Sequence, residues 1–297
     1  MSKSVEYNTF KLKGEGDKAV NEIKGILKGI NIDGEVNEDE IRELDAWCER
    51  HQDITGLKPF SEFLHKIRQA IREDVSWEEA VEEMYWLSQK YEGNYYAGVT
   101  ADLQTLQGVC HGILADGVVN ENEVKELSEW LELNTHLRNY YPYAELRTVL
   151  LRILKDGVVD EDESIYLKRY FYEFVNLTDK ELETQIGDEV AGVKIQSICT
   201  YDPDIKIQGK NYCVTGELSR YTRKEFAQAI EDNGGYFQKN PTTETDYLIV
   251  GADGNELWAY ACYGKKVEHA LNLRRKGAKI TLVHEFDFFD VLDDLTN

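Results

Sequence analysis

The stretch YCVTGELSRYTRKEFAQAI, residues 212–230, decides the fold of the last third of this 297-residue chain. Its first four residues suit a buried strand, which ends in Thr215-Gly216, and apolar residues then return at helical spacing. The pattern predicts a short strand, a glycine turn and a basic amphipathic helix. A threonine hydroxyl and a glycine N–H at a strand end, facing a helix N-terminus, are suited to binding an anion.

The order of elements continues to residue 292 with a glycine pair and a short strand, a second buried strand, a second helix, and a last strand with a short helix. This β-α-β-β-α-β-α order resembles the BRCT domain, and in particular the single module at the end of bacterial NAD-dependent DNA ligases. The resemblance rests on VTGELS at 214–219, NGG at 233–235 and DYLIVG at 246–251. It implies an α/β domain over residues 208–297 with a four-stranded parallel sheet. Phe288 is a departure, because many BRCT domains have a tryptophan in the last helix.

The resemblance also implies a phosphate-binding site at the end of the first strand. Thr215 and Gly216 would supply a hydroxyl and an N–H, and Lys266, with Lys265 as the second choice, would supply an ammonium at a helix start. Three further cations flank this strand end and are candidates for DNA-backbone contacts: Arg220, Arg223 and Lys224. The alternative is that Thr215-Gly216 only shapes the turn and the lysines are solvated.

The net charge of −22 is unevenly distributed. Residues 206–292 carry 12 Lys+Arg and 12 Asp+Glu, whereas residues 1–205 carry 22 and 42. An acidic surface repels phosphate backbones, so any nucleic-acid contact is expected in the C-terminal module alone. A plain solvated surface would explain the acidity equally well.

The cysteines and the hydropathy indicate the compartment. The five cysteines are odd in number and form no C-x-x-C pair, so we expect reduced core thiols. The N-terminus has no hydrophobic signal segment, and no apolar run approaches the ~18 residues of a membrane span. These features predict a cytoplasmic protein with no membrane partner.

Residues 17–186 have helical apolar spacing and repeat one turn motif three times. The motif reads DGEVNEDE at 33–40, DGVVNENE at 116–123 and DGVVDEDE at 156–163. An apolar residue precedes each Asp by three positions and others follow by eleven and fourteen, so a helix enters each turn and another leaves it. The longer gap between the first two copies leaves room for two more helices, at about 59–74 and 77–91.

Two interpretations of these turns compete. In the first, the glycines adopt a positive φ after one helix, and the next helix begins with a capping box. The residues concerned are Gly34, Gly117 and Gly157, the caps Asn37, Asn120 and Asp160, and Glu40, Glu123 and Glu163. In the second, the turns are calcium loops, but the positions that need the first carboxylates hold glycine, asparagine, leucine or arginine. The pattern resembles the TerB-like helical domains of tellurite resistance, which implies a compact all-α domain used for protein contacts.

Motifs of catalysis are missing. The sequence has no P-loop, no G-x-G-x-x-G and no K-x-D-G of a nucleotidyl-accepting ligase lysine. We therefore expect no catalytic residue, no metal site and no cofactor. The predicted organisation is a lead-in at 1–16, an acidic all-α TerB-like region at 17–186, a linker at 187–207 and the BRCT-like domain at 208–297.

The predicted function is that of a non-enzymatic adaptor of DNA repair, replication or genome defence. Its BRCT-like domain would bind a 5′-phosphorylated DNA end or a phosphorylated protein, and its helical region would dock a protein partner. The alternative is a phosphate-independent scaffold or dimerisation module that uses an aromatic surface such as Trp258.

Overall fold

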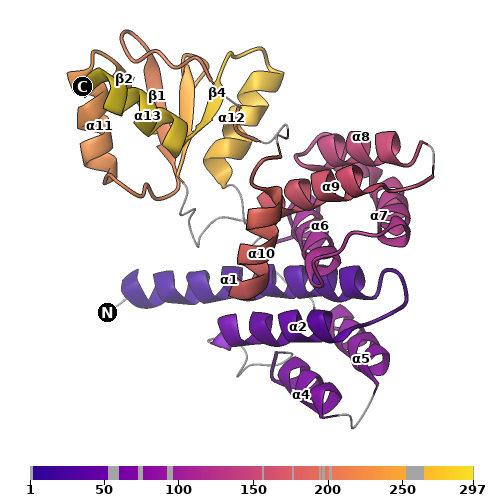
Figure 1. The fold of residues 1–297 in the computed structure, drawn as a ribbon. Helices are drawn as coiled ribbons and strands as arrows, with labels where there is room; N and C mark the ends of the chain where they lie inside the picture. The colour runs from indigo at the N-terminus through magenta and orange to yellow at the C-terminus, as the bar shows by residue number, and fades with distance from the viewer. Residues whose placement is uncertain are drawn as a thin grey trace. The chain divides into compact units, whose positions relative to one another are not determined.

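The computed structural model divides the chain into two compact units, Met1–Ile195 and Gln196–Asn297, which Figure 1 shows as a helical part and a part built on a sheet. The structure describes residues 3–52, 60–72, 76–91, 96–155, 157–175, 177–193, 195, 198–200, 203–251 and 264–296, without the side chains of 3–13, 60 and 296.

The first unit is helical throughout its described elements. They are α1 (Lys3–Ile30), α2 (Glu38–Arg50), α4 (Phe60–Ile71), α5 (Trp77–Gln89), α6 (Val99–Leu114), α7 (Glu121–Leu133), a 3₁₀ turn (Thr135–Leu137), α8 (Tyr143–Ile153), α9 (Glu161–Phe174) and α10 (Lys180–Val190). No helix among the described residues combines the length and apolarity that a membrane span requires.

The helical region is longer at both ends than the sequence predicted. Helix α1 begins at Lys3, so residues 3–16 of the expected lead-in belong to a helix. Helix α10 continues through Gly187 to Val190, past the predicted boundary at 186. At Gly187 a Cβ would lie 3.1 Å from the Tyr172 hydroxyl, so this glycine makes room for a neighbouring helix and does not break its own.

All three Asp-Gly turns are helix caps, as predicted. The turn glycines have φ values of 83°, 74° and 79° at Gly34, Gly117 and Gly157. Each following helix has a complete capping box, with the caps at Asn37, Asn120 and Asp160 and the third residues at Glu40, Glu123 and Glu163. Each box satisfies backbone N–H groups that would otherwise have no partner in the first helical turn.

The first two turns also bind each other. Asn37 donates its side-chain amide to the Asp116 carboxylate at 3.0 Å, and Asn120 donates to the Asp33 carboxylate at 3.2 Å. Each cap therefore serves its own helix through its oxygen and the opposite turn through its nitrogen. The first two copies of the motif form a pair in which corresponding residues exchange contacts.

The helices that lead into these two turns, α1 and α6, cross at glycines. A Cβ on Gly25 would lie 2.1 Å from the Thr105 carbonyl oxygen, and a Cβ on Gly108 would lie 2.1 Å from the Glu22 carbonyl oxygen. A real Cβ cannot come this close to an oxygen atom, so only glycine fits at these two positions. The two helices therefore pack at backbone contact distance.

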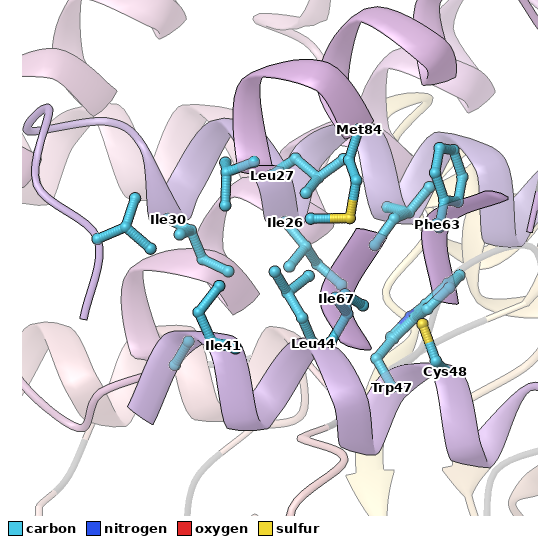
Figure 2. Close-up of a cluster of buried hydrophobic side chains, with 14 of the residues drawn as sticks. Ile26, Leu27, Ile30, Ile41, Leu44, Trp47, Cys48, Phe63, Ile67 and Met84 are labelled. Carbon is cyan, nitrogen blue, oxygen red and sulfur yellow. The ribbon is translucent and has the colours of Figure 1, made fainter. Parts of the chain in front are cut away.

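A buried cluster joins α1 to α2, α4 and α5, as Figure 2 shows. Ile26 and Leu27 of α1 lie opposite Leu44 of α2, and all three are fully buried. Further members are Ile30, Ile41, Trp47, Cys48, Phe63, Ile67 and Met84. The apolar stripe predicted for the helix after the first turn is thus its buried face.

The second unit contains a four-stranded parallel sheet, which confirms the predicted α/β architecture. Its strands are β1 (Asn211–Thr215), β2 (Tyr236–Phe237), β3 (Tyr247–Val250) and β4 (Thr281–His284), in the order β2-β1-β3-β4. Its helices are α11 (Arg223–Asp232), α12 (Lys265–Arg275) and α13 (Glu285–Thr296).

Phe288 has a structural role in this unit. Its ring is fully buried, 5.5 Å from the Tyr212 ring of β1 and 5.2 Å from the Phe226 ring of α11. It therefore connects the last helix to the sheet and to the first helix. The phenylalanine thus fills this part of the core.

Candidate anion-binding site

The predicted phosphate residues meet at the carboxyl end of β1. Strand β2 pairs only with Asn211 and Tyr212, so the last residues of β1 have no strand neighbour on that side. Lys266 donates its ammonium to the Val214 carbonyl oxygen at 2.9 Å. Arg223 donates to the Gly216 carbonyl oxygen at 3.0 Å. We call Thr215, Gly216, Arg223 and Lys266 the strand-end site.

The strand-end site has an excess of positive charge. Partial burial lowers the pKa of Lys266, and repulsion by Arg223 and by Lys239 lowers it further, against an opposing effect of the Cys213 thiol. Within the described residues, none of these three cations forms an ion pair with a carboxylate. Cations held close together without a counter-charge favour an anion.

Two hydrogen-bond donors lie at the same place. Thr215 is buried, with 3% of its surface exposed, and Gly216 has a φ of 77° that favours glycine. Among the residues that the structure describes, neither the Thr215 hydroxyl nor the Gly216 N–H has a hydrogen-bond partner. A hydroxyl, a backbone N–H and an ammonium are the groups that bind phosphate oxygens.

The loop that carries Gly216 is fixed from two sides. The fully buried carboxylate of Glu285, at the start of α13, accepts the Ser219 N–H at 3.0 Å. Gly251, after β3, lies so close that a Cβ would be 2.0 Å from the Glu217 carbonyl oxygen. These contacts hold the turn in one position before any ligand binds.

The remaining predicted residues lie apart from this arrangement. Lys265 is exposed, whereas Lys266 is the half-buried lysine that reaches β1. Arg220 forms an ion pair with Asp293 at 2.8 Å and lies over the Phe289 ring, so its side chain packs on α13. Lys224 is exposed and joins none of the described contacts at the strand end.

Sequence reasoning missed two residues of the site, Lys239 and Glu285. Lys239 follows β2 almost directly, and the carboxyl ends of neighbouring parallel strands lie at one edge of a sheet, so its position after a predicted strand was a usable signal. Glu285 gave no signal, because its role depends on the Ser219 N–H 66 positions away.

Some predicted residues lie outside the described part of the chain. They are Trp258 of the alternative aromatic surface and Asp156 of the third turn. In the described ranges, no group of three or more His, Cys, Asp or Glu side chains is arranged to hold a metal ion.

The paired turns contain carboxyl groups with displaced pKa values. Burial raises the pKa of Glu40 to about 8 and that of Glu123 to about 9. Hydrogen bonds from the cap N–H groups act in the opposite direction, and the nearby carboxylates of Asp33 and Asp116 raise both values further. These glutamates cap helices, and their raised pKa values favour the protonated carboxyl group at neutral pH.

A second titratable cluster surrounds the fully buried His111 of α6. Its Nε2 lies 2.7 Å from Glu43 of α2, and its Nδ1 lies 3.8 Å from Glu22 of α1. Burial alone would lower the pKa of His111, but these two carboxylates raise it to about 9. Glu43 also accepts the Thr178 and Asp179 N–H groups before α10, so the cluster joins four segments of the helical unit.

Comparison with known proteins agrees with this geometry. The family model described as "BRCA1 C Terminus (BRCT) domain" matches residues 203–292. The DNA ligase of Fervidobacterium nodosum is 38% identical over 95 residues, which is 30% of this chain and 14% of that ligase. The DNA ligase of Petrotoga mobilis is 36% identical over 85 residues, 28% of this chain and 10% of the ligase. The DNA ligase of Dehalococcoides mccartyi is 38% identical over 98 residues, 32% and 13% of the two chains.

The chain thus spans about one seventh or less of the length of these ligases. No solved structure matches it significantly. The resemblance of the helical unit to TerB-like domains stays a prediction. The family match, the ligase similarity and the parallel sheet agree on the C-terminal unit: residues 203–292 are a BRCT domain.

Proposed function

We propose that this chain is a non-enzymatic adaptor of DNA repair, replication or genome defence. Its BRCT domain binds the 5′-phosphate of a DNA end, and its helical unit docks a protein partner. The observation that carries the proposal is the meeting of Arg223, Lys239 and Lys266, without a carboxylate partner in the described residues, beside the Thr215 hydroxyl and the Gly216 N–H.

The geometry supports a phosphate as the ligand. Lys266 and Arg223 now donate to backbone carbonyl oxygens, which carry only partial charge, so a phosphate dianion would be the stronger acceptor for both. Phosphate binding would also return the pKa of Lys266 toward its usual value, because it supplies the missing counter-charge.

The charge distribution favours an end over the side of a duplex. Residues 206–292 have equal numbers of acidic and basic side chains, and residues 1–205 have an excess of 20 acidic ones. Long duplex contacts need many cations, whereas one terminal phosphate needs only a small cluster. The matched relatives are named DNA ligases, which makes a DNA terminus a suitable ligand to test first. A phosphorylated protein would present the same chemical group.

The proposal is tested by fluorescence anisotropy of the full chain on a recessed-end duplex with either a 5′-phosphate or a 5′-hydroxyl, at two salt concentrations. We expect at least about tenfold tighter binding to the phosphate, or ~1.4 kcal/mol. Thr215→Ala combined with Lys266→Met should remove that preference, and Lys265→Met is the matched control because Lys265 is exposed. Equal binding of both duplexes by the unaltered protein would refute end recognition.

A phosphate-independent scaffold is the second candidate, and one observation favours it. Tyr236 on the edge strand β2 is 61% exposed, and Phe286 at the start of α13 is 52% exposed. Aromatic side chains on a domain surface are common anchors of protein interfaces. If the chain self-associates in light scattering and Tyr236→Ser abolishes the association, the scaffold function gains support.

A further inference from the structure

The hairpin of α4 and α5 contains an open groove of about 860 Å³. Glu62, His65 and Lys66 line it from α4, and Glu79, Glu82, Glu83 and Trp86 from α5. The opposite faces of both helices belong to the core, where Phe63 and Met84 are fully buried. The groove therefore lies on the solvent side of a hairpin whose other side is fixed.

The groove has more carboxylates than its one lysine, Lys66, can pair with. Lys66 forms an ion pair with Glu83. Within the described residues, the carboxylates of Glu79 and Glu82 have no such partner. The helical spacing of residues 79, 82, 83 and 86 places them on one face of α5, so two uncompensated charges lie within two turns of a tryptophan.

Trp86 is 59% exposed, which is unusual for the largest apolar side chain. The Lys90 ammonium lies 3.1 Å from the centroid of its ring. The face of the indole thus already accepts a cation, and this cation belongs to the exposed residue that directly follows α5. A lysine or arginine of a partner could bind the same face of the ring through a cation–π interaction.

We propose that the α4–α5 groove docks a lysine- or arginine-rich segment of a partner protein. One cationic side chain of the segment takes the place of Lys90 over Trp86, and others pair with Glu79 and Glu82. The proposal deepens, and rests on, the proposed docking of a protein partner by the helical unit. Charge complementarity selects the occupant: the carboxylates repel a nucleic acid or an acidic peptide and attract a basic one.

The test uses a fluorescein-labelled peptide of three Lys-Leu-Ala-Arg repeats, and a counterpart with glutamine at every lysine and arginine, in anisotropy titrations of the full chain. We expect the basic peptide to bind and Glu79→Gln with Glu82→Gln to weaken it by at least about fivefold. Trp86→Ala should weaken it by a similar factor. The matched control is Glu126→Gln with Glu129→Gln, two exposed carboxylates at the same spacing on α7, which should change binding by less than about twofold.

Equal weakening by the two double variants would overturn the proposal, because the peptide would then sense only the acidity of the whole unit. Unchanged affinity in Trp86→Ala would overturn the role of the ring. If light scattering shows a dimer of the full chain that Glu79→Gln with Glu82→Gln dissolves, the occupant is a second copy and the proposal of a partner segment fails.

The same variants separate this proposal from the phosphate site. Glu79→Gln with Glu82→Gln should keep the preference for 5′-phosphorylated DNA. Equal binding of the basic peptide and its glutamine counterpart by the unaltered protein, with an intact phosphate preference, overturns the groove alone. Intact peptide specificity without any phosphate preference supports the groove and overturns only the function proposed for the BRCT domain.

Discussion

The replacement Gly108→Ala tests the close crossing of α1 and α6 directly. Alanine is ordinarily the better helix residue, so an exposed Gly→Ala change in a helix stabilises a protein by about 0.5–1 kcal/mol. At Gly108, however, the new Cβ would lie 2.1 Å from the Glu22 carbonyl oxygen and 2.8 Å from the Gly25 Cα. Both neighbours are backbone atoms, which cannot rotate away as a side chain would.

The structure gives the size of the effect. Contacts become ordinary at 3.4 Å, so the alanine methyl is more than 1 Å too close and α1 must move away from α6. Overpacking of this kind costs about 1–3 kcal/mol, and the cost falls at the upper end where the obstacle is backbone. After the gain in helix propensity, we expect a net loss of about 2 kcal/mol in the free energy of unfolding.

Gly16→Ala is the matched control, because Gly16 lies in α1 and a Cβ there would meet nothing within 4 Å. It should raise stability by up to about 1 kcal/mol. The assay is urea unfolding of the full chain followed by tryptophan fluorescence, since four of the five tryptophans lie in residues 1–195. If both variants stabilise the protein, α1 and α6 do not cross at these glycines and the paired arrangement of the first two motif copies is wrong.

Three further outcomes follow from the described contacts. Gly251→Ala should weaken binding of 5′-phosphorylated DNA about tenfold, because its Cβ would lie 2.0 Å from the Glu217 carbonyl oxygen and displace the loop; unchanged anisotropy would contradict this. Glu40→Gln with Glu123→Gln should flatten the fall in stability between about pH 4.5 and about pH 9: the folded-state pKa values are raised from 4.5 to about 8 and about 9, so stability that is fully present below pH 4.5 is lost as the pH rises through them, and glutamine cannot ionise. Parallel urea midpoints across this range for the altered and unaltered proteins would refute the buried protons. Lys265→Met should leave stability within about 0.5 kcal/mol, because the side chain is exposed; a larger loss in thermal unfolding would reveal a contact that the structure lacks.

Features that depend on neighbours in the sequence were predictable. A capping box requires only a cap residue and a glutamate three positions later, so Asn120 and Glu123 define one by themselves. The positive φ of Gly117 follows from its place after an apolar helical stretch. Strand β1 with its Thr-Gly end is likewise a local pattern. It carries part of the resemblance to BRCT domains, and that resemblance correctly implied the parallel sheet.

Features that depend on distant residues were not predictable in the same way. The amide of Asn37 binds Asp116, 79 positions away, and nothing near Asn37 indicates this partner. In the sequence, the glycines of the α1–α6 crossing are only residues of low helix propensity; their role becomes clear from the backbone that faces them. Gly187 misled the domain boundary for the same reason, because the Tyr172 side chain gives it a purpose inside α10.

At the candidate site, the pairing of each cation with a carboxylate was likewise not predictable from the sequence. The sequence ranked Lys266 before Lys265 and set Arg220, Arg223 and Lys224 beside them, but it did not show which cations have a counter-charge. The structure gives Arg220 a carboxylate at 2.8 Å, whereas Lys266 and Arg223 contact only carbonyl oxygens among the described residues. An exposed ion pair such as that of Arg220 contributes little, and its cation is already neutralised. A cation that is partly buried without a counter-charge raises the free energy of the empty site, and a phosphate removes that cost on binding. Glu79 and Glu82 in the helical unit are exposed, so they lack this burial cost, but among the described residues they too have no partner of opposite charge. The two proposals therefore require ligands of opposite charge: an anion for the BRCT domain and a cationic segment for the helical unit.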